Sequence, residues 1–146
     1  MVFVGGIAER GTQPLRGVRV NADRMSGGRA EEDRGRIGPL EVVDVPALVA
    51  ACTDRWYNQT LCRVNDSVVR LAVVQGEYHW HKHDDEDEFF FVVSGRFLID
   101  LEDRTVELAL RQGFVVPKGV VHRTRAPERA VILMMEGAGI VPTGDA

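Results

Sequence analysis

The sequence predicts an all-β protein, a sandwich or barrel of short antiparallel strands, and three observations predict it. From residue 56 onward, β-branched and aromatic runs follow one another, with turn residues between them and little room for helices. In several runs the apolar residues alternate, which places them on one face of a sheet. The length of 146 residues is enough to bury one core without disulfides.

The chain divides into two parts of different composition. Residues 1–36 contain seven glycines and no steady hydrophobic period, which indicates an irregular N-terminal arm. Its apolar segments 2–4 and 18–20 are candidates for docking on a sheet, and the alternative interpretation is a mobile tail. Residues 37–146 form the predicted barrel domain.

One short helix is expected before the first strand. Asp44 has the properties of an N-cap residue and Pro46 falls in the first turn. The apolar run 46–52 that follows is therefore predicted to be helical.

Nine strands are expected after this helix. Residues 56–64 end at the turn pair Asn65-Asp66, and residues 67–76 are closed by Gly76. The remaining segments are 78–83, 88–94, 96–102, 104–110, 113–116, 121–125 and 129–136. In the hairpin formed by 96–102 and 104–110, alternation predicts one buried face made of Phe97, Ile99, Leu101, Val106, Leu108 and Leu110.

Two strands are apolar on both faces, namely residues 88–93, with Glu88 the exception, and residues 130–136, which end in a glutamate. Such strands need cover outside the barrel, from a second sheet, the N-terminal arm or another subunit. We therefore expect a homodimer.

Composition excludes several classes of function. The net charge is −4 and no long basic cluster is present, so a nucleic-acid partner is not expected. The N-terminus lacks the basic and apolar regions of a signal peptide, and no apolar run has the length of a membrane span, so we expect no membrane association and a cytoplasmic protein. Cys52 and Cys62 lack metal-site spacing and are interpreted as small buried residues.

Three of the four histidines stand at alternate positions, His79, His81 and His83. In a strand they would share one face, and two of them could reach one metal ion. Glu88 opens the next strand among apolar residues, where an ionised carboxylate is costly without a cation. The alternative is a set of surface histidines beside the acidic loop 84–87.

The sequence resembles the cupin superfamily in two motifs. His81-Lys82-His83, four residues, Glu88, six residues and Gly95 match the first motif, and residues 117–122, Pro-Lys-Gly-Val-Val-His, match the second. The resemblance covers about residues 60 to 137. It implies a small single-domain jelly-roll barrel (a double-stranded β-helix) with one metal ion, bound by His81, His83, Glu88 and His122. His79 is then a second-shell partner of the ligands, a pocket residue or an additional ligand.

The resemblance also implies a class of activity. Iron, manganese and zinc are the expected divalent ions, with nickel and copper as further options. Small cupins include dioxygenases, isomerases and aromatic polyketide cyclases, so the leading hypothesis is a metal-dependent oxygenase or isomerase/cyclase acting on a small molecule. The alternative is a non-catalytic cupin that binds or senses a small ligand. Phe90, Phe97 and Thr124 are the predicted pocket residues, and Arg123 and Arg125 are expected to point away from the metal.

Overall fold

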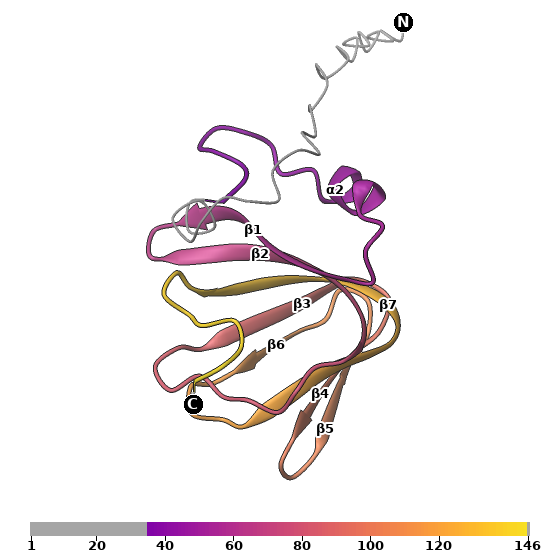
Figure 1. Cartoon of the computed structure of the whole chain (residues 1–146), viewed down its shortest axis with the longest axis vertical. Helices are drawn as coiled ribbons and strands as arrows, with labels where there is room; N and C mark the ends of the chain where they lie inside the picture. The colour runs from indigo at the N-terminus through magenta and orange to yellow at the C-terminus, as the bar shows by residue number, and fades with distance from the viewer. Residues whose placement is uncertain (1–34, 146) are drawn as a thin grey trace, which may run out of the picture.

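The computed structural model describes residues 35–145, and Figure 1 shows a β-barrel with a short helix outside it. Residues 1–34, which include nearly all of the predicted arm, lie outside the described part. The helix is α2 (Val45–Ala51). The strands are β1 (Trp56–Val64), β2 (Ser67–Glu77), β3 (Glu88–Ser94), β4 (Phe97–Leu101), β5 (Thr105–Leu108), β6 (Gly113–Val116) and β7 (His122–Gly137). The all-β jelly-roll prediction is confirmed.

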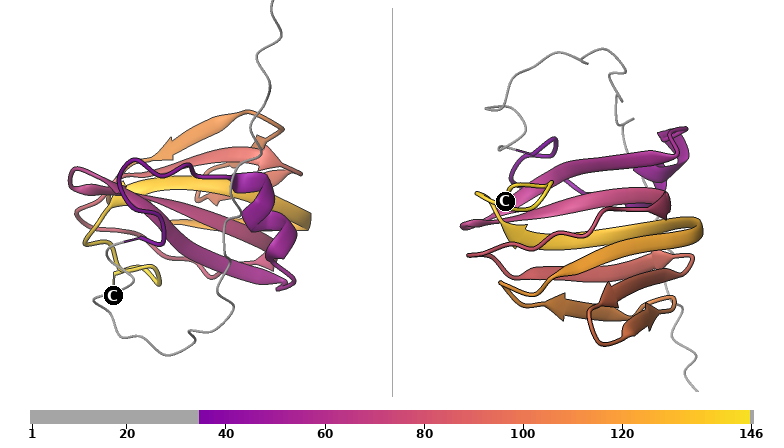
Figure 2. Two further views of the ribbon diagram at one scale, coloured as in Figure 1. Left: turned by 90° about the horizontal axis from the view of Figure 1, so that it is seen from above. Right: turned by 60° about the horizontal axis from the view of Figure 1, so that its bottom comes forward.

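The strand β7 organises the sheet. Strand order is β1-β2-β7-β3-β6, and β4 pairs with both β5 and β7. The first residues of β7 pair with β4, and residues 130–136 lie between β2 and β3 (Figure 2). Residues at the two ends of this one strand therefore meet at the same mouth of the barrel, since Glu88 at the start of β3 pairs with Glu136 and His122 bridges to His81.

The predicted strand 78–83 is wrong. The ladder between β2 and β7 shifts at Gly76, whose φ is +112°. Beyond it, the Tyr78 N–H donates to the Thr124 carbonyl, and the next contact is an isolated bridge between His81 and His122. Three steps of one segment thus oppose two of the other, so an extra residue breaks the alternation of side chains.

Two further predictions are corrected. The predicted strands 121–125 and 129–136 are parts of the single strand β7. Leu110 is 53% exposed rather than buried, because β5 ends at Leu108 and the chain turns there. The first two strands, in contrast, begin and end within one residue of the predicted positions.

The core has two parts, one inside the barrel and one outside it. The inner cluster includes Phe90, Phe97 and Ile132. The outer cluster is centred on Leu61, Leu71, Val73 and Val131, and side chains of α2 pack against it. As predicted, Asp44 is the N-cap of α2: its Oδ1 accepts a hydrogen bond from the Ala47 N–H at 3.0 Å. The helix thus provides part of the outside cover that the apolar strands need, and the homodimer stays a prediction.

An ion cluster lies on the outer face, where β4 meets β7. Asp100 Oδ2 accepts hydrogen bonds from Nε of both Arg123 and Arg125, each at 2.8 Å, and Thr105 donates to Oδ1. These bonds, led by that from Arg125, hold the pKa of Asp100 well below its usual range. The expected outward direction of the two arginines agrees with this cluster. Among residues 35–145, no helix is long and apolar enough to cross a lipid bilayer.

We expect Asp100→Asn to lower the free energy of unfolding at pH 7 by about 1–3 kcal/mol. A depressed pKa stabilises the folded protein above the unfolded pKa of about 3.9, and this contribution is lost as the pH falls further. The difference between wild type and variant should therefore shrink below about pH 4, as measured by urea denaturation at several pH values. Glu107→Gln, in an exposed pair with Arg96, is the control and should show little difference at any pH. A constant Asp100→Asn difference down to pH 2 would contradict the assignment.

Candidate metal centre

Three side chains from separate segments meet at the barrel mouth. His81, Glu88 and His122 each offer one ligand atom, and these atoms lie within 4.8 Å of one another. Glu88 and His122 are the first residues of β3 and β7, and His81 is placed by its backbone bridge to His122. Imidazole nitrogens and a carboxylate oxygen are ligands that zinc, iron, manganese, nickel and copper accept.

Backbone carbonyls orient two of these rings. Nδ1 of His81 donates to the His79 carbonyl, and Nδ1 of His122 donates to the Val120 carbonyl, both at 3.0 Å. A carbonyl only accepts, so each Nδ1 carries the proton and each Nε2 keeps its lone pair for a metal. Burial lowers the pKa of His81, which favours the neutral form that binds metals.

His83 lies beside this group. Its side chain is 3% exposed, and its Nε2 is 3.7 Å from Glu88 Oε2. Its Nδ1 is buried without a hydrogen-bond partner. A buried polar atom without a partner costs roughly 1–3 kcal/mol, so this ring needs a further interaction. The residues present therefore fit a metal ion, with His83 next to the three that converge.

The predicted pocket residues lie below this group. Phe90 and Phe97 are 2% and 3% exposed, with ring centroids 5.5 Å apart, and Thr124 is 8% exposed. Phe90 also lies edge-on to His122, at 6.3 Å between centroids. Phe90 and Phe97 therefore belong to the inner core, and Phe90 brings that core into contact with His122.

His79 is not part of the converging group. Its Nε2 donates to the Thr143 carbonyl at 2.8 Å, while its own carbonyl orients His81. The contact between His79 and the candidate ligand His81 is therefore made through the His79 backbone carbonyl.

The segment 141–145, here named the C-terminal strap, lies over these histidines. Besides the bond from His79, the Tyr78 hydroxyl donates to the Pro142 carbonyl at 3.2 Å, and the Asp145 N–H donates to the Lys82 carbonyl at 2.9 Å. Gly144 has φ +86°, and a Cβ there would lie 2.6 Å from the His81 Cβ. The strap is therefore in direct contact with a candidate ligand. The sequence analysis did not identify it.

Two charged residues at the mouth were also missed. Glu136 is 4% exposed and stands directly opposite Glu88 in the ladder, and Arg70 Nε lies 2.5 Å from Glu136 Oε1. Burial raises the pKa of Glu136 to about 8, Arg70 opposes this shift, and Glu88 adds to it. The alternation of side chains in β7 could have predicted that Glu136 points inward, because it continues the buried series Ala130, Ile132 and Met134. The Arg70 side chain also points inward, toward Glu136.

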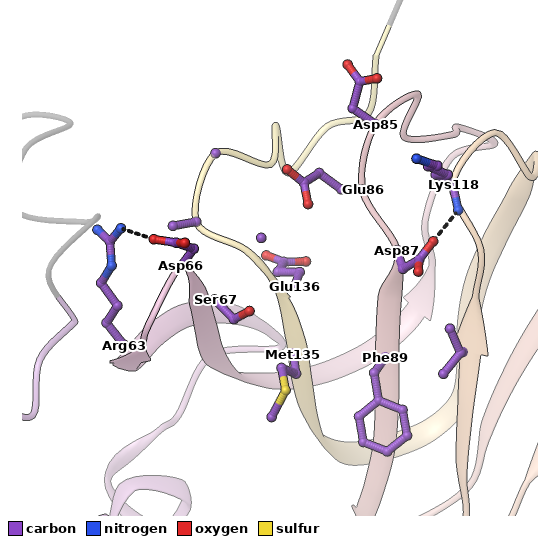
Figure 3. Close-up of a pocket in the computed structure, with 14 residues that line it drawn as sticks. Arg63, Asp66, Ser67, Asp85, Glu86, Asp87, Phe89, Lys118, Met135 and Glu136 are labelled. Carbon is purple, nitrogen blue, oxygen red and sulfur yellow. Dashed lines mark hydrogen bonds and ion pairs between the residues drawn. The ribbon is translucent and has the colours of Figure 1, made fainter.

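A surface hollow of about 750 Å³ lies next to the centre, with Phe89 and Met135 among its apolar lining (Figure 3). Its polar lining includes Asp66, the acidic residues 85–87 and Glu136. None of the four candidate ligands lines it. The acidic run therefore lies at the edge of the barrel mouth, and this hollow does not open onto the candidate metal centre.

Comparisons with known proteins identify the family and the fold. Residues 67–136 match the family model described as "Cupin domain". An uncharacterised protein of Bacillus subtilis, YdbB, is 44% identical over 91 residues, which are 62% of this chain and 80% of that protein. A cupin-2 domain protein of Shewanella frigidimarina superposes with a TM-score of 0.63 at 31% identity, covering 66% of this chain and 94% of that one. Protein NMB1881 of Neisseria meningitidis gives 0.61 at 26% identity, covering 66% and 99%.

We expect Gly144→Ala to displace the strap, because a Cβ would collide with His81 at a backbone conformation that disfavours side chains. Diethyl pyrocarbonate should then modify His81 several-fold faster than in wild type, as measured by mass spectrometry. Gly139→Ala is the matched control, because a Cβ there meets nothing within 4 Å. Equal rates in all three proteins would show that the strap does not shield His81.

Proposed function

Because this chain belongs to the cupin superfamily, we propose that it is a metal-dependent enzyme acting on a small organic molecule at a single divalent ion. The ligands would be His81, His83, Glu88 and His122. The observation that carries the proposal is the convergence of three ligand atoms within 4.8 Å, with two imidazoles fixed by backbone carbonyls. Such an ion, when bound, supplies Lewis-acid polarisation or redox chemistry with oxygen.

The residues around the centre support chemistry on a compact, weakly polar molecule. Phe90 and its neighbours exclude water from below, and the strap covers the histidines from above. In such a dry site, electrostatic interactions with a substrate are stronger than in water. The Trp80 ring, in contrast, packs against the Arg123 guanidinium at 5.3 Å, on the outside of the barrel.

A second candidate is a non-catalytic cupin that binds or senses a small ligand. The observation that favours it is closure: His83, Glu88 and His122 are each at most 4% exposed, and the strap contacts His81. The discriminating experiment is a panel of catechol-like, diketone-like and sugar-like compounds, offered to the metal-loaded protein. Turnover that requires the metal supports the enzyme; saturable binding without turnover supports the sensor.

We expect the protein purified without added metal, or reconstituted, to contain close to one ion per chain by element-specific analysis. Glu88→Gln and His122→Ala should remove most of this metal, because each takes away a ligand from the group. Glu107→Gln, an exposed carboxylate, should leave occupancy unchanged. Iron, manganese, nickel or copper would favour oxygen or redox chemistry, and zinc would favour isomerisation or cyclisation.

The proposal fails if both ligand variants keep full occupancy. It also fails if wild type neither contains nor takes up a metal.

A further inference from the structure

A row of charged side chains crosses three neighbouring strands at the barrel mouth. Arg70 comes from β2, Glu136 from β7 and Glu88 from β3. Glu136 and Glu88 are direct partners in the antiparallel ladder, so their side chains share the inner face. Arg70 pairs with Met134, two residues from Glu136 on the same face, and this diagonal is within reach of a long side chain.

Burial makes this row costly. Glu88 and Glu136 are each 4% exposed, and the Arg70 side chain is 15% exposed. Replacing a buried ion pair with apolar residues is often neutral or stabilising, so stability alone is a weak reason for this one. Burying two adjacent carboxylates, Glu88 and Glu136, is less favourable still. The Arg70–Glu136 pair is therefore better explained by an effect on the neighbouring Glu88 than by stability.

The neighbour is the candidate carboxylate ligand. Glu136 and Glu88 are direct ladder partners on the inner face, so their side chains are neighbours. Glu88 Oε2 lies 3.2 Å from Nε2 of His122 and 3.7 Å from Nε2 of His83. A glutamate side chain has three rotatable bonds, so pointing one oxygen at these rings requires contacts that restrict it.

We propose that Arg70 and Glu136 are positioning residues that hold Glu88 in the orientation needed to bind the metal. This inference rests on the proposed metal centre. The Arg70 guanidinium holds the Glu136 carboxyl group through their ion pair, and that group limits the positions open to the neighbouring Glu88 side chain. Neither Arg70 nor Glu136 is itself a ligand.

The chain contains a matched control for this row. Arg125 and Asp100 form a second pair between an arginine and a buried carboxylate, on the outer face of the same barrel. Both pairs involve β7, but only the Arg70–Glu136 pair faces Glu88. A substitution in either pair removes a buried ion pair. Only a substitution in the Arg70–Glu136 pair should also alter the position of Glu88.

The experiment measures the dissociation constant of wild type and variants for Zn²⁺ or Mn²⁺, by competition with a chromophoric chelator. We expect Arg70→Met and Glu136→Leu to weaken binding by about 10–100-fold, the usual effect of losing an outer partner of a ligand. Arg70→Lys and Glu136→Gln, which keep hydrogen-bonding groups, should recover part of the loss. Arg125→Met should lower stability to urea yet bind metal within about twofold of wild type.

The Co²⁺-substituted proteins give a second readout. The visible absorption of bound Co²⁺ depends on ligand geometry, so Arg70→Met should change the spectrum and Arg125→Met should not. If Arg70→Met or Glu136→Leu does not fold, the comparison of Arg70→Lys and Glu136→Gln with wild type carries the test, and a smaller loss of affinity is expected.

Wild-type affinity in every inner variant would overturn the inference and leave the proposed function standing. An equal loss of affinity in Arg125→Met would also overturn it, because the effect would then be one of general stability. A wild-type protein that binds no metal would overturn both the inference and the proposed function.

Discussion

The rest of the structure depends on a buried carboxylate, that of Glu88, at the mouth of the barrel. Taking an ionised carboxylate out of water costs several kcal/mol unless cations or hydrogen-bond donors surround it. Here its Oε2 faces two imidazoles, and its cross-strand neighbour is another acid, Glu136. The Arg70 guanidinium contacts Glu136 rather than Glu88. The arrangement is consistent with a divalent ion among the histidines, which would balance the Glu88 charge.

The long strand β7 makes this arrangement possible. It starts at His122 beside β4, runs along the barrel, and returns between β2 and β3 to end at Gly137. One strand thereby supplies a candidate ligand at its beginning and the neighbour of another ligand near its end. Its outward side chains Arg123 and Arg125 bind Asp100 of β4, so ion pairs on the outer face also join β7 to β4.

Local features of this structure can be predicted from the sequence, whereas contacts between strands cannot. The N-cap at Asp44, the turn at Asn65-Asp66 and the spacing of His81, Glu88 and His122 are local or motif-level signals, and the structure agrees with each. The alternation of His79, His81 and His83 was misleading, because an extra residue between Tyr78 and His81 breaks the register. The roles of Arg70 and Glu136 depend on which strands are neighbours, and that information is not local.

The closed mouth of the barrel is compatible with an enzyme as well as with a non-catalytic binding protein. The strap is held by a few hydrogen bonds, and its residues are half-buried or exposed apart from the preceding Ile140, which is 7% exposed. A segment with so few buried apolar contacts opens at a small fraction of the global unfolding free energy. Opening it requires no change in the barrel, whose ladders hold Glu88 and His122. Under the proposed function, local opening of the strap would admit a substrate to the centre, and reclosure would return the site to a state with less water, in which its charges act more strongly.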